Sequence, residues 1–226
     1  MNQHNSTRAV VLEKPEQLGL HDLDLAEPHV ADVIVDVEWS GISTGTEKLL
    51  YTGAMPVFPG MGYPLVPGYE SVGRVREAGP TSGHSVGERV FVPGARCFGD
   101  VRGLFGASAS RLVVPGARAI SISEDLGESA VLLALAATAY HAVAGGGQRD
   151  PIVPPDLIVG HGVLGRLLAR MTVLADYPAP TVWETCTERC PNGCDPARTM
   201  DALREMALDV SPGSPPRAVL AFHRAF

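Results

Sequence analysis

The sequence predicts an α/β protein in two parts: a β-rich N-terminal part that closes into a barrel, and a shorter part that begins a β-α-β unit. Short apolar runs, cut by Gly and Pro, follow one another from Ala9 to Val114, which is typical of a barrel or curled sheet. A strand, a glycine-rich turn and a helical pattern then follow in order between Leu157 and Ala175.

Five strands are expected in the first part. They are rich in β-branched residues, and turn residues separate them. Their ranges are 9–12, 33–39, 70–79, 87–93 and 110–115.

A helix is expected over 129–143, because this stretch is rich in Ala and Leu and has no helix breaker. Glu128 lies near its start and Gly145 follows its end. Since the stretch is apolar nearly all round, we expect the helix to be buried. It links the two parts of the chain.

The composition excludes several functional classes. The 226 residues carry a net charge of -7 with scattered Arg residues, so the basic stripe of a nucleic-acid-binding protein is absent. No run approaches the roughly 18 apolar residues of a membrane span. The polar N-terminus has no signal peptide, and this favours a cytoplasmic protein whose four cysteines are free thiols.

A glycine motif after the strand 157–159 predicts a dinucleotide site. Gly160 permits a tight turn, Gly162 lets the backbone approach a pyrophosphate, and Gly165 lets helix and strand pack closely. An anion is stabilised at the N-terminus of the following helix. The predicted cofactor-binding residues are Gly160, His161, Gly162, Val163, Leu164, Gly165 and Glu184.

Glu184 follows the next apolar segment, about twenty residues beyond the motif. Its carboxylate would accept hydrogen bonds from ribose hydroxyls and repel a 2′-phosphate, which favours NAD over NADP. The alternative is a strand, turn and helix in which the glycines only form the turn.

Four motifs resemble the medium-chain dehydrogenase/reductase superfamily. They are G-I-S-T-G-T-E at 41–47, P-G-Y-E-S-V-G-R-V at 67–75, G-E-R-V at 87–90 and T-A-Y-H-A at 138–142. The resemblance implies a GroES-like β-barrel catalytic domain followed by a Rossmann-type nucleotide-binding domain, which here is cut short.

Within this superfamily, the chain is similar to the bacteriochlorophyllide a dehydrogenase family. The runs that carry this resemblance lie at 40–50, 59–73, 91–95, 98–106 and 156–170. It implies oxidation of the 1-hydroxyethyl group on a bacteriochlorophyllide to an acetyl group, late in bacteriochlorophyll synthesis. The implied substrate is a bacteriochlorophyllide-type tetrapyrrole.

The residues at the zinc positions of this superfamily differ from its usual ligands. Ser43 and Tyr69 stand where zinc alcohol dehydrogenases have Cys and His, and the third position, near Leu135 and Ala136, is apolar. Neutral hydroxyls are poor zinc ligands, so we expect no catalytic zinc of the usual kind. Cys97 stands alone, so the four-cysteine structural zinc lobe is also missing.

Oxidation of an alcohol without zinc requires a side chain to accept the proton. Glu47, Tyr69 and Glu70 are the candidate bases, with hydroxyls of Ser43, Thr44 and Thr46 as possible relays. The alternative is that Glu70 and Thr46 only hold loops in place. The predicted catalytic residues are Ser43, Thr46, Glu47, Tyr69 and Glu70.

A large, flat substrate requires an apolar wall and a partner for its propionate. The run 54–65 is apolar and rich in Pro, Met and aromatic residues, so it is a candidate wall. Arg96 or Arg102 is a candidate partner of the carboxylate. The alternative is a Pro-rich loop that packs on its own domain.

The family pattern is expected to end after Glu184. The segment 185–226 carries three cysteines at a spacing unlike common zinc sites, and its composition is typical of a truncated or frameshifted reading frame. The expected domains are a disordered N-terminus at 1–8, a GroES-like domain at 9–127, a linking helix and loop at 128–150, a partial Rossmann unit at 151–184 and an atypical tail at 185–226. Dimerisation is doubtful, because the strands that often pair are absent.

Two other functions fit the sequence. One is a zinc-free quinone or enone reductase of the same superfamily, which Glu184 disfavours because such enzymes commonly use NADPH. The other is an inactive product that only binds pigment or a partner protein.

Overall fold

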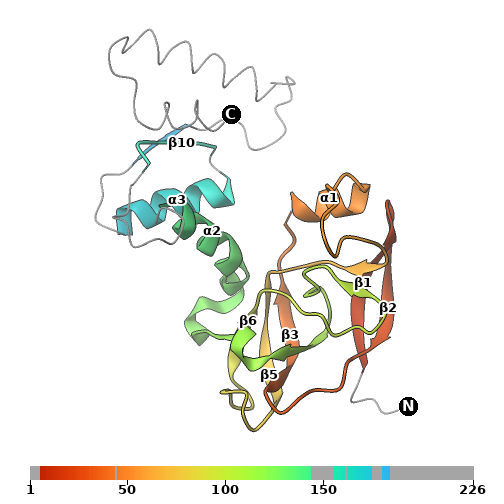
Figure 1. Cartoon of the computed structure of the whole chain (residues 1–226). Coiled ribbons are helices and arrows are strands. Elements are labelled where there is room, and N and C mark those ends of the chain that lie inside the picture. Colours follow the sequence, from red (N-terminus) through yellow and green to blue (C-terminus); the bar gives the residue numbers. More distant parts are fainter. Residues whose placement is uncertain (1–5, 44, 144–154, 161, 175–179, 184–226) are drawn as a thin grey trace. The chain divides into compact units, whose positions relative to one another are not determined.

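The computed structural model describes residues 6–43, 45–143, 155–160, 162–174 and 180–183 (Figure 1). The chain divides into two units, Met1–Ala134 and Leu135–Phe226. Each unit is described by itself below.

The larger sheet of the first unit has the strand order β8-β3-β5-β6-β9, and all neighbours are antiparallel. Its strands are β3 (Asp32–Ser40), β5 (Ser71–Ala78), β6 (Arg89–Val92), β8 (Arg111–Pro115) and β9 (Ile120–Ser121). The β-branched run Val33, Ile34 and Val35 is buried in β3, as its strand propensity predicts. The four strands expected here from the sequence are confirmed, with ends shifted by at most two residues.

The second sheet of this unit has the order β2-β1-β4-β7. Its strands are β1 (Ser6–Lys14), β2 (Gln17–Asp24), β4 (Leu65–Val66) and β7 (Arg102–Gly103). The two sheets are joined where the Val10 N–H donates to Ser108 O at 2.9 Å and the Ser110 N–H donates to Arg8 O at 2.8 Å. This connection forms the β-rich barrel. Its first strand, β1, begins at Ser6, inside the range 1–8 that the sequence predicts to precede the barrel domain.

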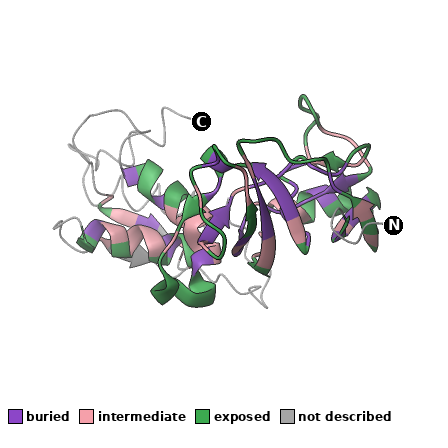
Figure 2. Cartoon of the chain, turned by 90° about the horizontal axis from the view of Figure 1, so that it is seen from below, coloured by how far each residue is buried: buried purple, intermediate pink, exposed green. Residues whose placement is uncertain are grey.

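The main core lies inside this barrel and consists largely of valine and alanine (Figure 2). Cys97 belongs to this core, and burial raises the pKa of its thiol to about 11. The thiol is therefore protonated at neutral pH.

The short helix α1 (Thr46–Thr52) follows β3 and was not expected from the sequence. It ends at Gly53, whose φ of 72° is the left-handed conformation that glycine adopts most readily at helix ends. Leu50 is its one buried residue and packs in a small cluster with Leu12 and Leu65. This helix places Thr46 and Glu47 beside the barrel.

The linking segment is a 3₁₀ helix, η2 (Glu124–Leu132), followed by α2 (Leu133–Val143). The break between helical turns lies at Gly127, whose φ of 51° and ψ of -145° are not helical. The helix expected over 129–143 exists, but the expectation that it is buried is wrong: among its residues, Ala130, Ala139 and Val143 are the buried ones. Strands β3, β5 and β6 contact η2.

The stretch Glu124–Val143 has 20 residues, and an 18-residue window within it has a mean hydropathy of 1.4, so it is long and apolar enough to cross a membrane. The expectation of no such stretch is therefore wrong on length and composition. This is weak evidence for a membrane span, because core helices of soluble proteins pass the same test.

The second unit contains β10 (Leu157–Val159), α3 (Val163–Leu174) and β11 (Thr181–Trp183). The strands β10 and β11 are parallel, with Leu157 opposite Thr181. The order strand, glycine turn, helix and parallel strand is the one that the sequence predicts.

Candidate functional site

Thr46 and Tyr69 meet at the predicted catalytic position of the first unit. Thr46 begins α1, and Tyr69 lies in the turn between β4 and β5. Their hydroxyl oxygens are 3.5 Å apart, at the outer limit of a hydrogen bond. The Tyr69 ring stands edge-on to the ring of Phe105, with centroids 5.1 Å apart and an angle of 67° between the planes.

Glu47 lies in the first turn of α1, where its backbone N–H donates to the Ser43 carbonyl at 3.0 Å. This bond brings Ser43 next to the helix start. Within the described residues, neither Glu47 carboxylate oxygen has a hydrogen-bond partner of normal geometry. Burial is the main cause that raises the Glu47 pKa. The backbone N–H of Glu47 lowers it, the charge of Glu70 raises it, and the backbone of Ser43 lowers it, in that order of size.

Glu70 directly precedes β5 and is 3% exposed. Its Oε1 has no hydrogen-bond partner within the described part of the chain. Burial raises the pKa of this carboxyl also. A Cβ at Gly41 would lie 2.2 Å from Glu70 Oε2, so the glycine at that position leaves room for the carboxylate.

These contacts place all five predicted catalytic residues in the first unit, on or beside α1 and the turn before β5. Two of them are carboxyls, Glu70 buried and Glu47 half-buried, and the charge of Glu70 adds to the cost of ionising Glu47. Carboxyls in such surroundings hold a proton more readily than exposed ones, as groups at proton-transfer sites commonly do. Thr44, the remaining relay candidate, lies outside the described residues. The catalytic roles stay predictions.

The donor set at the zinc positions does not fit zinc of the usual kind. Ser43 and Tyr69 supply neutral hydroxyls, and the Tyr69 hydroxyl already faces that of Thr46. Among the described residues, no three His, Cys, Asp or Glu side chains cluster as a metal site would require.

The glycine motif lies between β10 and α3 in the second unit. Gly160 has a φ of 105°, and a Cβ there would meet open space. A Cβ at Gly165 would lie 2.0 Å from the Gly160 carbonyl oxygen, so only glycine permits this contact of helix and turn. The Arg166 N–H donates to Gly162 O at 3.0 Å, so the helical bonds begin directly after the turn.

Val163 and Leu164 form the first turn of α3 and are partly exposed, at 49% and 38%. The predicted His161 and Glu184 lie outside the described residues. The binding role of the residues in this turn stays a prediction.

Two hollows lie on the first unit. One, of about 450 Å³, is a largely apolar groove that Glu47 lines together with Trp39, Ile42 and Tyr51. The other, of about 690 Å³, contains Arg96 and Arg102, the two candidate carboxylate partners, together with Phe58 and Pro59 of the candidate wall. Sequence reasoning missed Arg118 and Phe105, which also line this pocket. No spacing signal could have found them, because separate loops bring them together.

Comparison with protein families matches residues 29–124 to the alcohol dehydrogenase GroES-like domain. The chain is 57% identical over 188 residues to a 2-desacetyl-2-hydroxyethyl bacteriochlorophyllide A dehydrogenase from Cereibacter sphaeroides, a match that covers 81% of this chain and 58% of that protein. It is 49% identical over 212 residues to the protein of the same name from Rhodobacter capsulatus, which covers 93% of this chain and 63% of that protein. The chain thus spans less than two thirds of the length of these relatives.

These matches bear on the segment after Glu184. The match to the C. sphaeroides protein covers 81% of this chain, and residues 1–184 also make up 81% of its length. The share matched to the R. capsulatus protein, 93%, is larger and must include residues beyond Glu184. The second relative therefore contradicts the expectation that the resemblance ends at Glu184.

Solved structures of dehydrogenases share the fold. A zinc-binding dehydrogenase from Sinorhizobium meliloti, bound to NADP, has a TM-score of 0.60 and 25% identity over 79% of this chain and 56% of that one. An alcohol dehydrogenase from E. coli CFT073, complexed with NADH, has a TM-score of 0.60 and 22% identity over 89% of this chain and 67% of that one. The fold is that of a GroES-like domain followed by the start of a Rossmann-type unit.

Proposed function

We propose that this chain belongs to the medium-chain, alcohol-dehydrogenase-like superfamily, and that it oxidises the 1-hydroxyethyl group of a bacteriochlorophyllide to an acetyl group. Its GroES-like domain and its similarity to two bacteriochlorophyllide dehydrogenases support this. The alcohol carbon gives a hydride to NAD⁺ and the hydroxyl gives a proton to the protein, so the products are a ketone, NADH and a proton. The observation that carries the proposal is the 57% identity to the 2-desacetyl-2-hydroxyethyl bacteriochlorophyllide A dehydrogenase from C. sphaeroides. The cytoplasm is the proposed compartment.

The proton acceptor in this proposal is Glu47. Glu47 is half-buried and lines a groove of the first unit, whereas Glu70 is 3% exposed. A base works best when its pKa lies near the operating pH, and burial moves the Glu47 pKa in that direction. Thr46 and Tyr69 then position the alcohol or relay its proton through their facing hydroxyls.

NAD supplies the hydride acceptor when bound. In the proposal, the backbone N–H groups of Gly162 and Val163 at the start of α3 bind its pyrophosphate, and Gly160 leaves space for it. Glu184 binds the ribose hydroxyls and selects NAD over NADP. The proposal needs no zinc, because the hydroxyls of Ser43 and Tyr69 are poor zinc ligands.

The first experiment is an NADH fluorescence titration of the full 226-residue chain, with intact mass to verify the C-terminus. Saturable binding that Glu184→Ala weakens is the expected result, and NADH formation with the hydroxyethyl pigment is then measured. If a folded chain of full mass binds no NADH, the dehydrogenase proposal fails for this polypeptide.

A second candidate function is pigment binding without turnover. It is favoured by one observation: the chain spans 58% and 63% of the length of its two curated relatives. Pigment binding in the absence of any NADH binding would support it.

A further inference from the structure

Three arginines line the larger pocket of the first unit. Arg96 lies in the loop after β6, Arg102 in β7 and Arg118 in η1 (Gly116–Arg118). All three are exposed, and the pocket volume of about 690 Å³ lies within the range of roughly 300–1,000 Å³ that is common for small-molecule sites.

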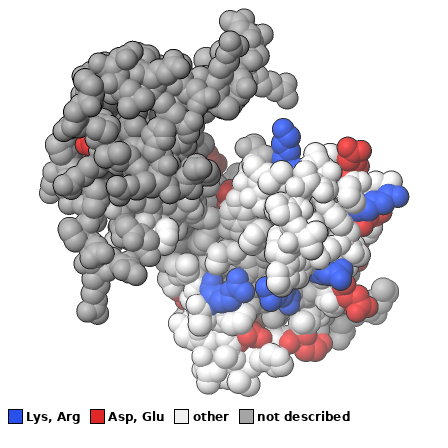
Figure 3. Space-filling model, turned by 45° about the horizontal axis from the view of Figure 1, so that its top comes forward, with Lys and Arg blue, Asp and Glu red and all other residues white. Residues whose placement is uncertain are grey.

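These arginines differ from the others of this unit in their partners. Arg8, Arg74, Arg76, Arg89 and Arg111 each form an ion pair with a carboxylate. Arg96, Arg102 and Arg118 form none within the described residues, although Asp100 lies in the same loop region. Basic and acidic side chains both occur on the face of this unit that Figure 3 shows. The pocket therefore carries positive charge that no described carboxylate neutralises.

Arg102 is held in a fixed position. Its Nη1 donates to the Tyr63 carbonyl oxygen at 3.1 Å. A Cβ at Gly62 would lie 3.1 Å from the Arg102 guanidinium carbon, so the glycine backbone lies directly against this group. A guanidinium fixed in this way loses little conformational freedom when it binds a planar carboxylate.

Two aromatic rings line the pocket. Phe58 and Phe105 line it and are 37% and 42% exposed, so both offer ring surface to a ligand. Phe105 has a φ of 63°, a conformation that is unfavourable for a bulky residue and is often found at ligand sites. The same ring contacts Tyr69 edge-on, so the pocket borders the predicted catalytic position.

We propose that this pocket binds the free propionate of the tetrapyrrole substrate through Arg102, with Arg96 and Arg118 beside it, while Phe58 and Phe105 contact the flat ring. The inference rests on the proposed function and adds the position of the carboxylate. The groove beside Glu47 is less suited to this task, because its arginine, Arg8, already donates two hydrogen bonds to Asp22.

The test compares two probes, a chlorin with one free propionate and the methyl ester of the same chlorin, by fluorescence titration of the full chain without NAD. The free acid is expected to bind at least about tenfold more tightly than the ester. Arg102→Gln should remove this preference and leave ester binding unchanged. The matched control is Arg76→Gln, which removes an exposed arginine outside the pocket and should change neither affinity.

Equal binding of acid and ester by the unaltered chain would overturn the inference, whether or not Arg102→Gln folds. Equal weakening of both probes by a folded Arg102→Gln chain would overturn it too. Because these titrations need no turnover, a chain that prefers the acid and yet forms no NADH would refute only the proposed function. A chain that oxidises acid and ester equally well and binds them equally would refute only this inference.

Discussion

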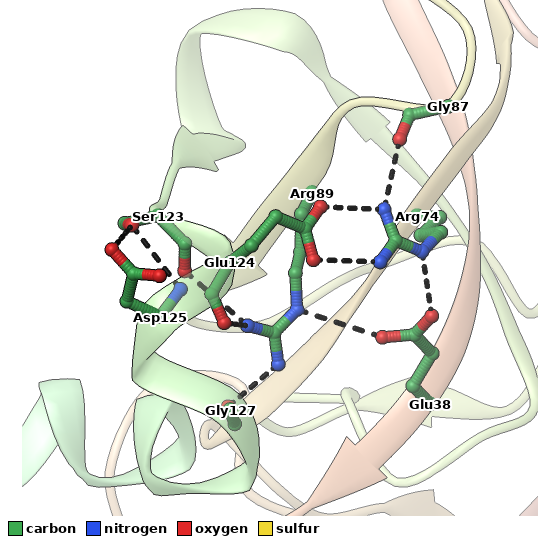
Figure 4. Close-up of polar contacts among 8 residues, drawn as sticks. All are labelled: Glu38, Arg74, Gly87, Arg89, Ser123, Glu124, Asp125 and Gly127. Carbon is green, nitrogen blue, oxygen red and sulfur yellow. Dashed lines mark hydrogen bonds and ion pairs between the residues drawn. The ribbon is translucent and has the colours of Figure 1, made fainter.

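Arg89 donates a hydrogen bond of 2.6 Å from Nη2 to the carbonyl oxygen of Gly127, across 38 positions of the sequence (Figure 4). Its Nη1 donates to the carbonyls of Ser123 and Glu124, and its Nε lies 3.6 Å from Glu38. One buried arginine of β6 therefore fixes the start of the linking segment to the barrel.

Arg89→Met should lower the free energy of unfolding of the first unit by roughly 2 kcal/mol, because it removes the part-buried hydrogen bonds that the charged guanidinium donates to three backbone carbonyls. Urea unfolding followed by circular dichroism measures this change. Arg76→Met is the control, since Arg76 is an exposed arginine whose loss should cost less than about 0.5 kcal/mol. Equal effects of the two substitutions would contradict the structural role of Arg89.

Gly127→Ala should also destabilise this connection. The glycine has a φ of 51° and a ψ of -145°, which residues with a Cβ rarely adopt, and a Cβ there would meet open space. The expected cost is therefore conformational alone, roughly 1–2 kcal/mol in urea unfolding. The control is Gly45→Ala, where φ is -79° and no atom lies within 4 Å of the added Cβ, so no loss is expected.

The barrel strands could be predicted because their local sequence and their environment agree. Val33, Ile34 and Val35 favour a strand, and all three are buried in one. The strand β2 was missed because Leu18 and Leu20 are 58% and 69% exposed and alternate only weakly with polar residues. The helix α1 was missed because seven residues between glycines give too short a pattern, although Gly53 is a recognisable stop signal.

The candidate site was predictable one residue at a time but not as an arrangement. The motif positions of Glu47 and Glu70 marked both as candidates, yet their burial depends on how α1 lies beside the barrel. Arg118 and Phe105 were missed because a pocket wall joins residues from separate loops. Such contacts depend on tertiary packing, which local sequence does not encode.

Glu70→Gln should stabilise the chain at neutral pH. Burial raises the Glu70 pKa above its unfolded value, so the folded state loses stability as the pH rises through these two pKa values. The glutamine variant avoids this loss, and its Tm should exceed that of the unaltered chain at pH 7 but not at pH 4. The control Glu77→Gln replaces an exposed glutamate of β5 and should shift Tm little at either pH. A higher Tm at pH 4 alone would show that the sign is wrong.

Glu47→Gln should lower kcat by about 100-fold or more while NADH affinity stays unchanged, because it removes the proposed base. In the unaltered enzyme, kcat should fall as the pH drops through the raised Glu47 pKa, since the protonated acid cannot accept a proton. The variant should lack this decline. A variant that keeps the same pH profile would assign the base to another residue, and Tyr69→Phe would be tested next.

Gly165→Ala should weaken NADH binding at least about tenfold. The added Cβ would lie 2.0 Å from the Gly160 carbonyl oxygen, so α3 must move away from the turn whose N–H groups are proposed to bind the pyrophosphate. NADH fluorescence titration measures the loss. Chlorin binding is the internal control: its proposed pocket lies in the first unit, so the pigment should bind the variant as before. Unchanged NADH affinity in a folded Gly165→Ala chain would mean that the cofactor does not depend on this turn, and the assignment of the glycine motif would fail.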